Sequence, residues 1–197
     1  MPELAFLFTL GAAASLIGDH SHVATGTTEY LTDAVPFIWS SPIWFPLLVA
    51  TATVSLAELR LRMRPPRTSV TARHGLAGVA AVLGIYIITA LEHTAPAVPV
   101  TVLIYVLAAI TWCVLGDGPG AVCGVLAAIG GPIVEAVIAE AGVFRYADDS
   151  NALFGVAPWL PALYFAFGVV VALLAEIAAK DREPSVKPSA TGTPATR

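Results

Sequence analysis

The chain has 197 residues and a formal net charge of −4, and 57% of its residues are hydrophobic while only 12% are charged. Soluble domains carry roughly 25% charged residues, so this composition argues against a water-soluble fold, which would leave too much apolar surface uncovered. No basic stripe of the kind that binds nucleic acid is present, and the length suits a single domain.

Six apolar segments separated by polar breaks predict six transmembrane helices. An apolar run of about 18 or more residues is typical of a helix that crosses a bilayer. The fold class is therefore predicted to be all-α, a polytopic integral membrane protein with one domain over residues 1–180. The predicted spans are residues 4–18, 36–57, 75–91, 96–115, 121–141 and 153–179.

The first segment could also be a cleaved signal peptide. Such a peptide begins with a positively charged region, whereas this chain has Glu3 near its start. A retained helix is therefore favoured.

The distribution of cations predicts the orientation of the helices. Nine of the ten Lys and Arg residues lie either in the loop at residues 60–73 or in the tail from Lys180 onward, and the tenth is Arg145. Loops rich in Lys and Arg stay on the cytoplasmic side. Six spans with both termini in the cytoplasm place all nine on that side. This predicts a plasma membrane location in a bacterium, or the endoplasmic reticulum in a eukaryote.

Two further segments are predicted from their composition. Residues 116–120, Gly-Asp-Gly-Pro-Gly, form a very tight turn, so the fourth and fifth helices are expected to lie side by side. The tail at residues 181–197 is polar and rich in Pro, Ser and Thr, and it is predicted to be disordered and cytoplasmic.

The middle of the fifth segment is its most unusual part. Gly130, Gly131 and Pro132 remove side-chain bulk and one backbone donor, which indicates either a bend that opens a cavity or a close helix crossing. Glu135 follows one turn later. A carboxylate within a membrane costs roughly 2.5–3.5 kcal/mol on insertion scales, so it should face protein or a wet cavity. A ligand-binding role and a purely structural hydrogen bond are both consistent with this position.

No metal site or catalytic pattern stands out. Asp19, His20 and His22 could bind a metal with Glu29 or Asp33, but no third ligand has a defined spacing, so polar loop residues are favoured. The cysteines, Cys113 and Cys123, are interpreted as small apolar residues. We therefore expect neither a metal nor a cofactor.

Aromatic residues gather near the ends of the predicted spans, where such rings anchor helices at the membrane surface. The segment from Trp39 to Pro46 differs, because two tryptophans and two prolines in eight residues make an irregular, bulky start to a helix. It could form one wall of a lateral portal from the membrane.

Several motifs, in chain order from about residue 33 to residue 178, resemble those of the Insig (insulin-induced gene) family of membrane proteins. They include an acidic residue and an aromatic–Ser–Ser–x–x–Trp–x–Pro motif before the second helix, a hydrophobic–acidic pair ending the third, and a Trp followed by an Asp after the fourth. Gly-Val-Phe-x-Tyr, Pro-Trp-Leu-Pro and Phe-x-Phe-Gly motifs follow at nearly the family's spacing. The matching residues are 33, 38–46, 91–92, 111–117, 142–146, 158–161 and 165–168.

The resemblance implies six spans, cytoplasmic termini and a non-catalytic sterol or lipid sensor. It also implies a partner-binding role for Asp117, although Gly118, Pro119 and Gly120 replace the Arg-Ser that follows in the family, so a different membrane-protein partner is expected. The bound lipid is expected to be a neutral amphipathic one, a sterol or diacylglycerol, held in an intramembrane pocket. The candidate lipid-binding residues are Trp39, Trp44, Tyr86, Glu92, Trp112 and Glu135.

Two other functions remain open on the sequence alone. One is a small membrane enzyme of isoprenoid-lipid metabolism that uses Glu135, Glu92, Asp148 or Asp149 as acid–base groups. The other is a proton-coupled transporter with Glu135 as its carrier site. The favoured hypothesis is a non-enzymatic protein whose partners are membrane lipids, another membrane protein and further copies of itself.

Overall fold

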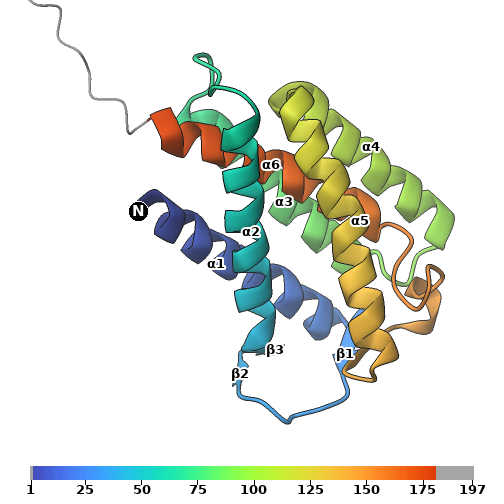
Figure 1. Cartoon of the computed structure of the whole chain (residues 1–197). Coiled ribbons are helices and arrows are strands. Elements are labelled where there is room, and N and C mark those ends of the chain that lie inside the picture. The colour runs from blue at the N-terminus through green and yellow to red at the C-terminus, as the bar shows by residue number, and fades with distance from the viewer. Residues whose placement is uncertain (1, 181–197) are drawn as a thin grey trace, which may run out of the picture.

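The computed structural model describes residues 2–180 and consists mainly of six long helices (Figure 1). Each helix is long and apolar enough to cross a membrane, which confirms the predicted all-α fold of six transmembrane helices. The tail predicted to be disordered, residues 181–197, lies outside the described residues. The helices are α1 (Pro2–Thr25), α2 (Trp44–Met63), α3 (Ala72–Leu91), α4 (Ala97–Leu115), α5 (Gly118–Glu140) and α6 (Leu160–Lys180).

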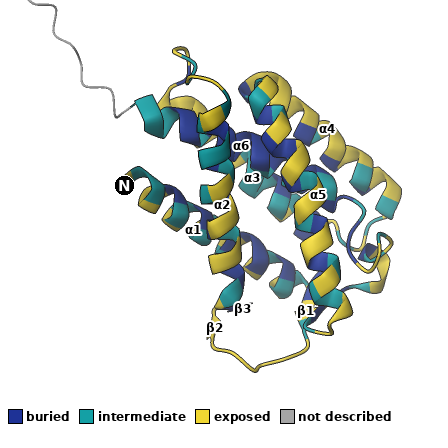
Figure 2. Ribbon diagram, in the orientation of Figure 1, coloured by how far each residue is buried: buried dark blue, intermediate teal, exposed yellow. Residues whose placement is uncertain are grey.

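Helix α6 lies at the centre of the bundle and packs against all five other helices (Figure 2). Its middle consists of small and β-branched residues such as Val169, Ala172 and Ala175, each at most 1% exposed. The other five helices each expose one apolar side, which suits contact with lipid rather than water. The core is therefore built around one buried helix.

Helices α5 and α6 approach closely at glycines. A Cβ atom on Gly168 would lie 2.5 Å from the carbonyl oxygen of Cys123, and one on Gly124 would lie 2.8 Å from the ring of Phe165. Small residues allow membrane helices to pack backbone against backbone. This packing corrects the expectation that α4 and α5 lie side by side: the two helices hardly touch, and both pack on α6 instead.

The second and sixth helices begin later than predicted. The apolar stretch before α2 forms a short hairpin of β2 (Phe37–Ile38) and β3 (Ser41–Pro42), with Trp39 at positive φ at its tip. Two prolines and this turn stop a helix from starting at residue 36. Before α6, Phe154 and Gly155 also have positive φ, so this helix starts at Leu160 rather than at 153.

The first helix extends beyond its predicted end at residue 18. Polar residues follow Gly18, but Asp19 and His22 are buried on the protein side of the helix, so the helix continues to Thr25. Gly26, with a φ of +79°, then ends it. The expectation that residues 19–22 form a polar loop was therefore wrong.

A second small sheet joins two distant loops at the end of the bundle away from residues 60–73. Strand β1 (Thr28–Tyr30) pairs antiparallel with β4 (Phe144–Tyr146), which precedes a short 3₁₀ turn, η1 (Asp148–Ser150). Glu29 and Arg145 face each other across the pair with a 2.7 Å salt bridge. The sheet thus closes one end of the space between α1, α2 and α5.

Candidate lipid-binding cavity

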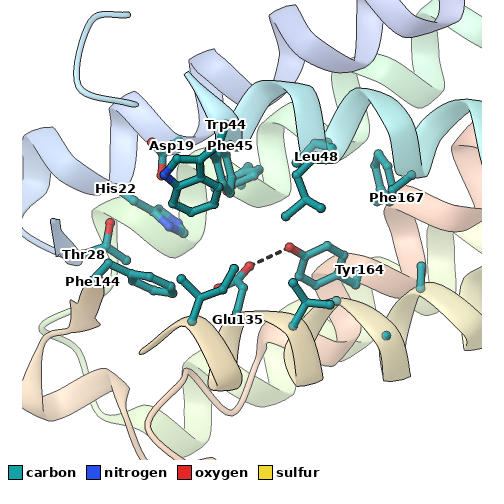
Figure 3. A pocket seen from close by; sticks show the side chains of 18 of the residues that line it. Asp19, His22, Thr28, Trp44, Phe45, Leu48, Glu135, Phe144, Tyr164 and Phe167 are labelled. Carbon is teal, nitrogen blue, oxygen red and sulfur yellow. Dashed lines mark hydrogen bonds between the residues drawn. The ribbon is translucent and has the colours of Figure 1, made fainter. Parts of the chain in front are cut away.

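A cavity of about 270 Å³ lies between α2 and α5, with α1, α3, α6 and the β1–β4 sheet around it (Figure 3). Leu48 of α2 and Leu126 and Val134 of α5 border it and are each 40–47% exposed, so the cavity opens towards the lipid-facing side of these helices. Gly130 and Gly131 also line it: nothing lies within 4 Å of a Cβ added at Gly130, whereas one on Gly131 would lie 2.5 Å from the ring of Tyr164 on α6. Of the two interpretations of this pair, the cavity fits Gly130, and the close helix crossing fits Gly131, which packs against α6.

The two ends of the cavity differ in polarity. The end near Trp44 carries the polar groups of Asp19, His22, Thr28 and Glu135, whereas the end near Leu56 and Leu126 is almost wholly apolar. Helices α2 and α5 run in opposite directions, so the start of α2 lies beside the end of α5, and the end of α2, at Arg60, lies beside the start of α5, at Asp117. Such an asymmetric space suits a molecule with one polar end and one hydrocarbon end.

Glu135 is 8% exposed and accepts hydrogen bonds from two tyrosines. The hydroxyl of Tyr146 donates to Oε2 at 2.6 Å and that of Tyr164 donates to Oε1 at 2.6 Å (Figure 3). Burial raises the pKa of Tyr146 well above its ordinary value, so its hydroxyl stays protonated and remains a donor. Glu135 thus fixes β4 and α6 against α5 and also belongs to the lining of the cavity.

Asp19 holds the other side of the polar end together. Its carboxylate accepts a hydrogen bond from the hydroxyl of Tyr30 at 3.0 Å and another from the hydroxyl of Ser41. Tyr30 also packs edge-on against the rings of Phe37 and Trp44. One buried carboxylate therefore ties α1 to β1 and to the β2–β3 hairpin.

His22 completes the polar end from one turn further along α1. The Thr89 hydroxyl donates its proton to the carbonyl of Tyr86, so Nε2 of His22 donates to Thr89 Oγ1 at 2.9 Å. The imidazole packs between the rings of Tyr86 and Trp159, with centroids 4.7 and 5.4 Å away. His22 is thus a buried structural residue whose ring also lines the cavity.

The structure brings three of the six predicted lipid-binding residues together, Trp44, Tyr86 and Glu135, all in the lining of the cavity. Trp39 is 69% exposed at the hairpin tip, Glu92 is exposed at the end of α3, and Trp112 is 40% exposed near Asp117. These three lie outside the lining. Aromatic and acidic residues occur near the ends of the spans both in the cavity lining and at the membrane surface. Residue type and position in the span therefore do not predict which of them line the cavity.

The sequence analysis missed several polar residues of the cavity. From the sequence, Asp19 and His22 are interpreted only as metal ligands or loop residues, and Tyr164 belongs to the aromatic residues near the ends of the spans, which are interpreted as anchors at the membrane surface. The signal that could have found them is the spacing of three residues between Asp19 and His22, which places both on one face of a helix. The missed polar lining residues are Asp19, His22, Thr28, Tyr30, Ser55, Tyr146 and Tyr164.

Asp117 lies at the opposite end of the molecule, in a cluster of buried and half-buried charges. Its carboxylate caps α5 by accepting from the backbone N–H of Gly120 at 2.7 Å and pairs with Arg60 at 3.1 Å. Arg60 and Glu176 are both 0% exposed and pair at 3.0 Å, and Arg67 pairs with Glu176 at 2.9 Å. Arg60 and Arg67 therefore hold α2 and the following loop to α5 and α6, in addition to any role in orienting the chain.

The residues of the alternative functions do not converge on the cavity. Asp148 and Asp149 are exposed in η1, and Glu92 is exposed too, so Glu135 is the member of that set that lines the cavity. Within residues 2–180, no three of His, Cys, Asp and Glu come close enough together to hold a metal ion.

Comparisons with known proteins place this architecture in a family. No family model matches the chain. It is 63% identical over 191 residues to an INSIG protein homologue of Mycolicibacterium vanbaalenii, covering 97% of this chain and 93% of that protein. The crystal structure of MvINS, a mycobacterial Insig homologue from Mycobacterium vanbaalenii, matches with a TM-score of 0.92 and 64% identity, over 93% of this chain and 97% of that one.

A second solved structure, a cross-linked trimer of an MvINS variant, matches with a TM-score of 0.92 and 62% identity over the same shares of the two chains. The motifs described above, the six helices and these alignments over nearly the whole chain agree. The protein is an integral membrane protein, which in a bacterium lies in the plasma membrane, and it belongs to the Insig family.

Proposed function

We propose that this protein binds a neutral amphipathic lipid, a sterol or diacylglycerol, in the cavity between α2 and α5, and that it acts as a non-enzymatic lipid sensor. The observation that carries the proposal is the polarity of the cavity, which is polar at the Trp44 end and apolar at the Leu56 end. A lipid hydroxyl would lie among the polar groups and the hydrocarbon part beside Leu56 and Phe167.

The charges of the lining support a neutral ligand. Two carboxylates, Asp19 and Glu135, line the cavity, and the lining contains neither Lys nor Arg. A phosphate group is negatively charged and binds where Arg or Lys can pair with it, so the phosphate of a phospholipid would have no cationic partner in this lining. A hydroxyl, in contrast, can donate to a carboxylate that has unused lone pairs.

Selectivity would come from hydrogen bonds and shape. A lipid that arrives from the bilayer gains little from burial of its chains, because it leaves one apolar surrounding for another. Tyr86 adds a free polar group, because its hydroxyl has no partner among residues 2–180. Pairing of the lipid's polar group with such side chains would distinguish the ligand from bulk lipid.

Binding would act on the fold through the groups that line the cavity. Asp19 connects α1 to the hairpin and Glu135 connects α5 to β4 and α6, so a bound lipid between them would alter the balance of these contacts. The altered helix packing would change the surface that binds a membrane-protein partner at Asp117 or further copies of the chain. The cross-linked MvINS trimer supports the second route.

The proposal is tested with the purified protein in detergent. Added dioleoylglycerol or cholesterol should raise the melting temperature, and lipid recovered afterwards should be chemically unchanged. A product that disappears in Glu135→Gln would instead indicate the enzyme, and uptake into proteoliposomes that depends on a pH gradient would indicate the transporter. Unchanged melting temperatures with both lipids would contradict the proposal.

A further inference from the structure

At the polar end of the cavity, Thr28 carries a buried hydroxyl that has no hydrogen-bond partner in the described part of the chain. The residue is 6% exposed, and its Oγ1 is one of three buried, unpaired side-chain polar atoms among residues 2–180, with Thr101 Oγ1 and Arg60 Nε. Of the three residues, Thr28 is the one that lines the cavity, where it lies beside His22 and Phe144 (Figure 3). A buried hydroxyl without a partner is unfavourable, so its presence at a cavity wall requires a reason.

The backbone holds Thr28 firmly, so the unpaired hydroxyl does not result from a loose loop. Thr28 pairs with Tyr146 in the β1–β4 sheet, and the carbonyl of Thr27 accepts from the N–H of Ala147 at 3.0 Å. The neighbouring side chains are all paired: Thr27 with the carbonyl of Ala90, Glu29 with Arg145 and Tyr30 with Asp19. Thr28 is the exception in an otherwise satisfied strand.

Thr28 and Tyr30 separate the cavity from a groove on the outer surface of the same end. Both residues line both spaces, and the groove is completed by Gly26, Glu29 and Ser40. The hydroxyl of Thr28 therefore lies at the level where the polar end of a bound lipid would come nearest to water. Four other hydroxyls at this end, those of Tyr30, Ser41, Tyr146 and Tyr164, already donate to carboxylates, which leaves Thr28 and Tyr86, among residues 2–180, as the free hydroxyls of the lining in this part of the cavity.

We infer that Thr28 is a lipid-binding residue whose hydroxyl donates to an oxygen of the ligand's polar group, either a hydroxyl or an ester carbonyl. The inference rests on the proposed function, because it requires a lipid in the cavity. This contact on β1 adds to the proposed contacts of Trp44 on α2, Tyr86 on α3 and Glu135 on α5. It would place the polar group of the ligand against the β1–β4 sheet. Occupancy by such an oxygen explains why the strand keeps a hydroxyl that the protein itself does not pair.

The test compares Thr28→Val, which has a similar shape without the hydroxyl, with Thr28→Ser, which retains it. Binding of dioleoylglycerol and of cholesterol is measured on the full-length protein, together with the melting temperature without added lipid. We expect Thr28→Val to bind about three- to tenfold more weakly, as for the loss of one neutral hydrogen bond. Thr28→Ser should bind as the wild type does.

The melting temperature of the lipid-free protein is a second measurement, and here Thr28→Val should not be weakened, in contrast to its lipid affinity. Thr28→Val removes an unpaired polar group, so its melting temperature should equal or exceed that of the wild type. Thr101→Val is the matched control, because it removes an unpaired hydroxyl from α4 away from the cavity and should leave lipid affinity unchanged. Wild-type affinity in Thr28→Val, or a lower melting temperature without lipid, would overturn the inference. Absence of lipid binding by the wild type would instead overturn the proposed function.

Discussion

At the scale of single residues, most buried polar groups of this protein are paired and connect one helix to another. Glu135 illustrates why its role could not be decided from sequence. Its position in an apolar span predicted that it should face protein or a cavity, and it does both, because two tyrosines bond its oxygens while it lines the cavity. Its tyrosine partners are 11 and 29 residues away, a distance at which the sequence shows no local pattern.

Replacement of Glu135 should show how much its hydrogen bonds to Tyr146 and Tyr164 contribute to the stability of the fold. Glu135→Ala leaves the hydroxyls of Tyr146 and Tyr164 without their acceptor, and each unpaired buried hydroxyl costs about 1–3 kcal/mol. Glu135→Gln keeps a carbonyl oxygen for one tyrosine and an amide for the other. We therefore expect Glu135→Ala to lower the melting temperature clearly more than Glu135→Gln. Equal effects of the two variants would mean that the tyrosine bonds contribute nothing.

The buried charges at the other end lead to a second prediction. Arg60→Met removes a fully buried partner of Glu176 and Asp117, and the loss of one member of a buried ion pair costs about 3 kcal/mol or more. Arg62→Met is the matched control on the same helix, because Arg62 and Glu58 are exposed and such pairs contribute about 0–1 kcal/mol. Unfolding of the purified variants in denaturant should separate them. Similar stabilities would show that the buried cluster is dispensable.

At the scale of helices and strands, the sequence predicted which segments span the membrane but not where each one ends. Hydropathy finds an apolar run, yet it does not distinguish a helix from the apolar hairpin at residues 37–42, and it stops at buried polar residues such as Asp19. The sequence also did not show which face of each helix packs against protein and which faces lipid. In a membrane, lipid-facing and core-facing sides are both apolar, so no stripe indicated that Trp44 lines a cavity while Trp112 does not.

The contact between α5 and α6 can be tested at its glycines. Gly168→Ala would place a methyl group 2.5 Å from the backbone oxygen of Cys123, which cannot move without shifting the helix. Overpacking of this kind costs about 1–3 kcal/mol, so a lower melting temperature is expected. Gly130→Ala on α5 is the control, because nothing lies within 4 Å of its added methyl group. A stable Gly168→Ala variant would contradict the close crossing.

At the scale of the whole molecule, the orientation of the chain in the membrane remains a prediction from its cations. Ser69→Cys and Asp33→Cys place a thiol in exposed loops at opposite ends of the bundle. In a background without Cys113 and Cys123, a membrane-impermeant maleimide added to intact cells should label Asp33→Cys and spare Ser69→Cys. The reverse labelling would place residues 60–73 outside and invert the topology.

The central claim is that the cavity between α2 and α5 holds a lipid, and native mass spectrometry of the purified protein tests it most directly. The wild type is compared with Ala52→Phe, which fills the cavity from α2, and with Thr51→Phe, which adds the same ring to an exposed position outside the lining. We predict a neutral lipid adduct on the wild type and on Thr51→Phe that is lost from Ala52→Phe. An adduct retained by Ala52→Phe, or absent from the wild type, would contradict the account.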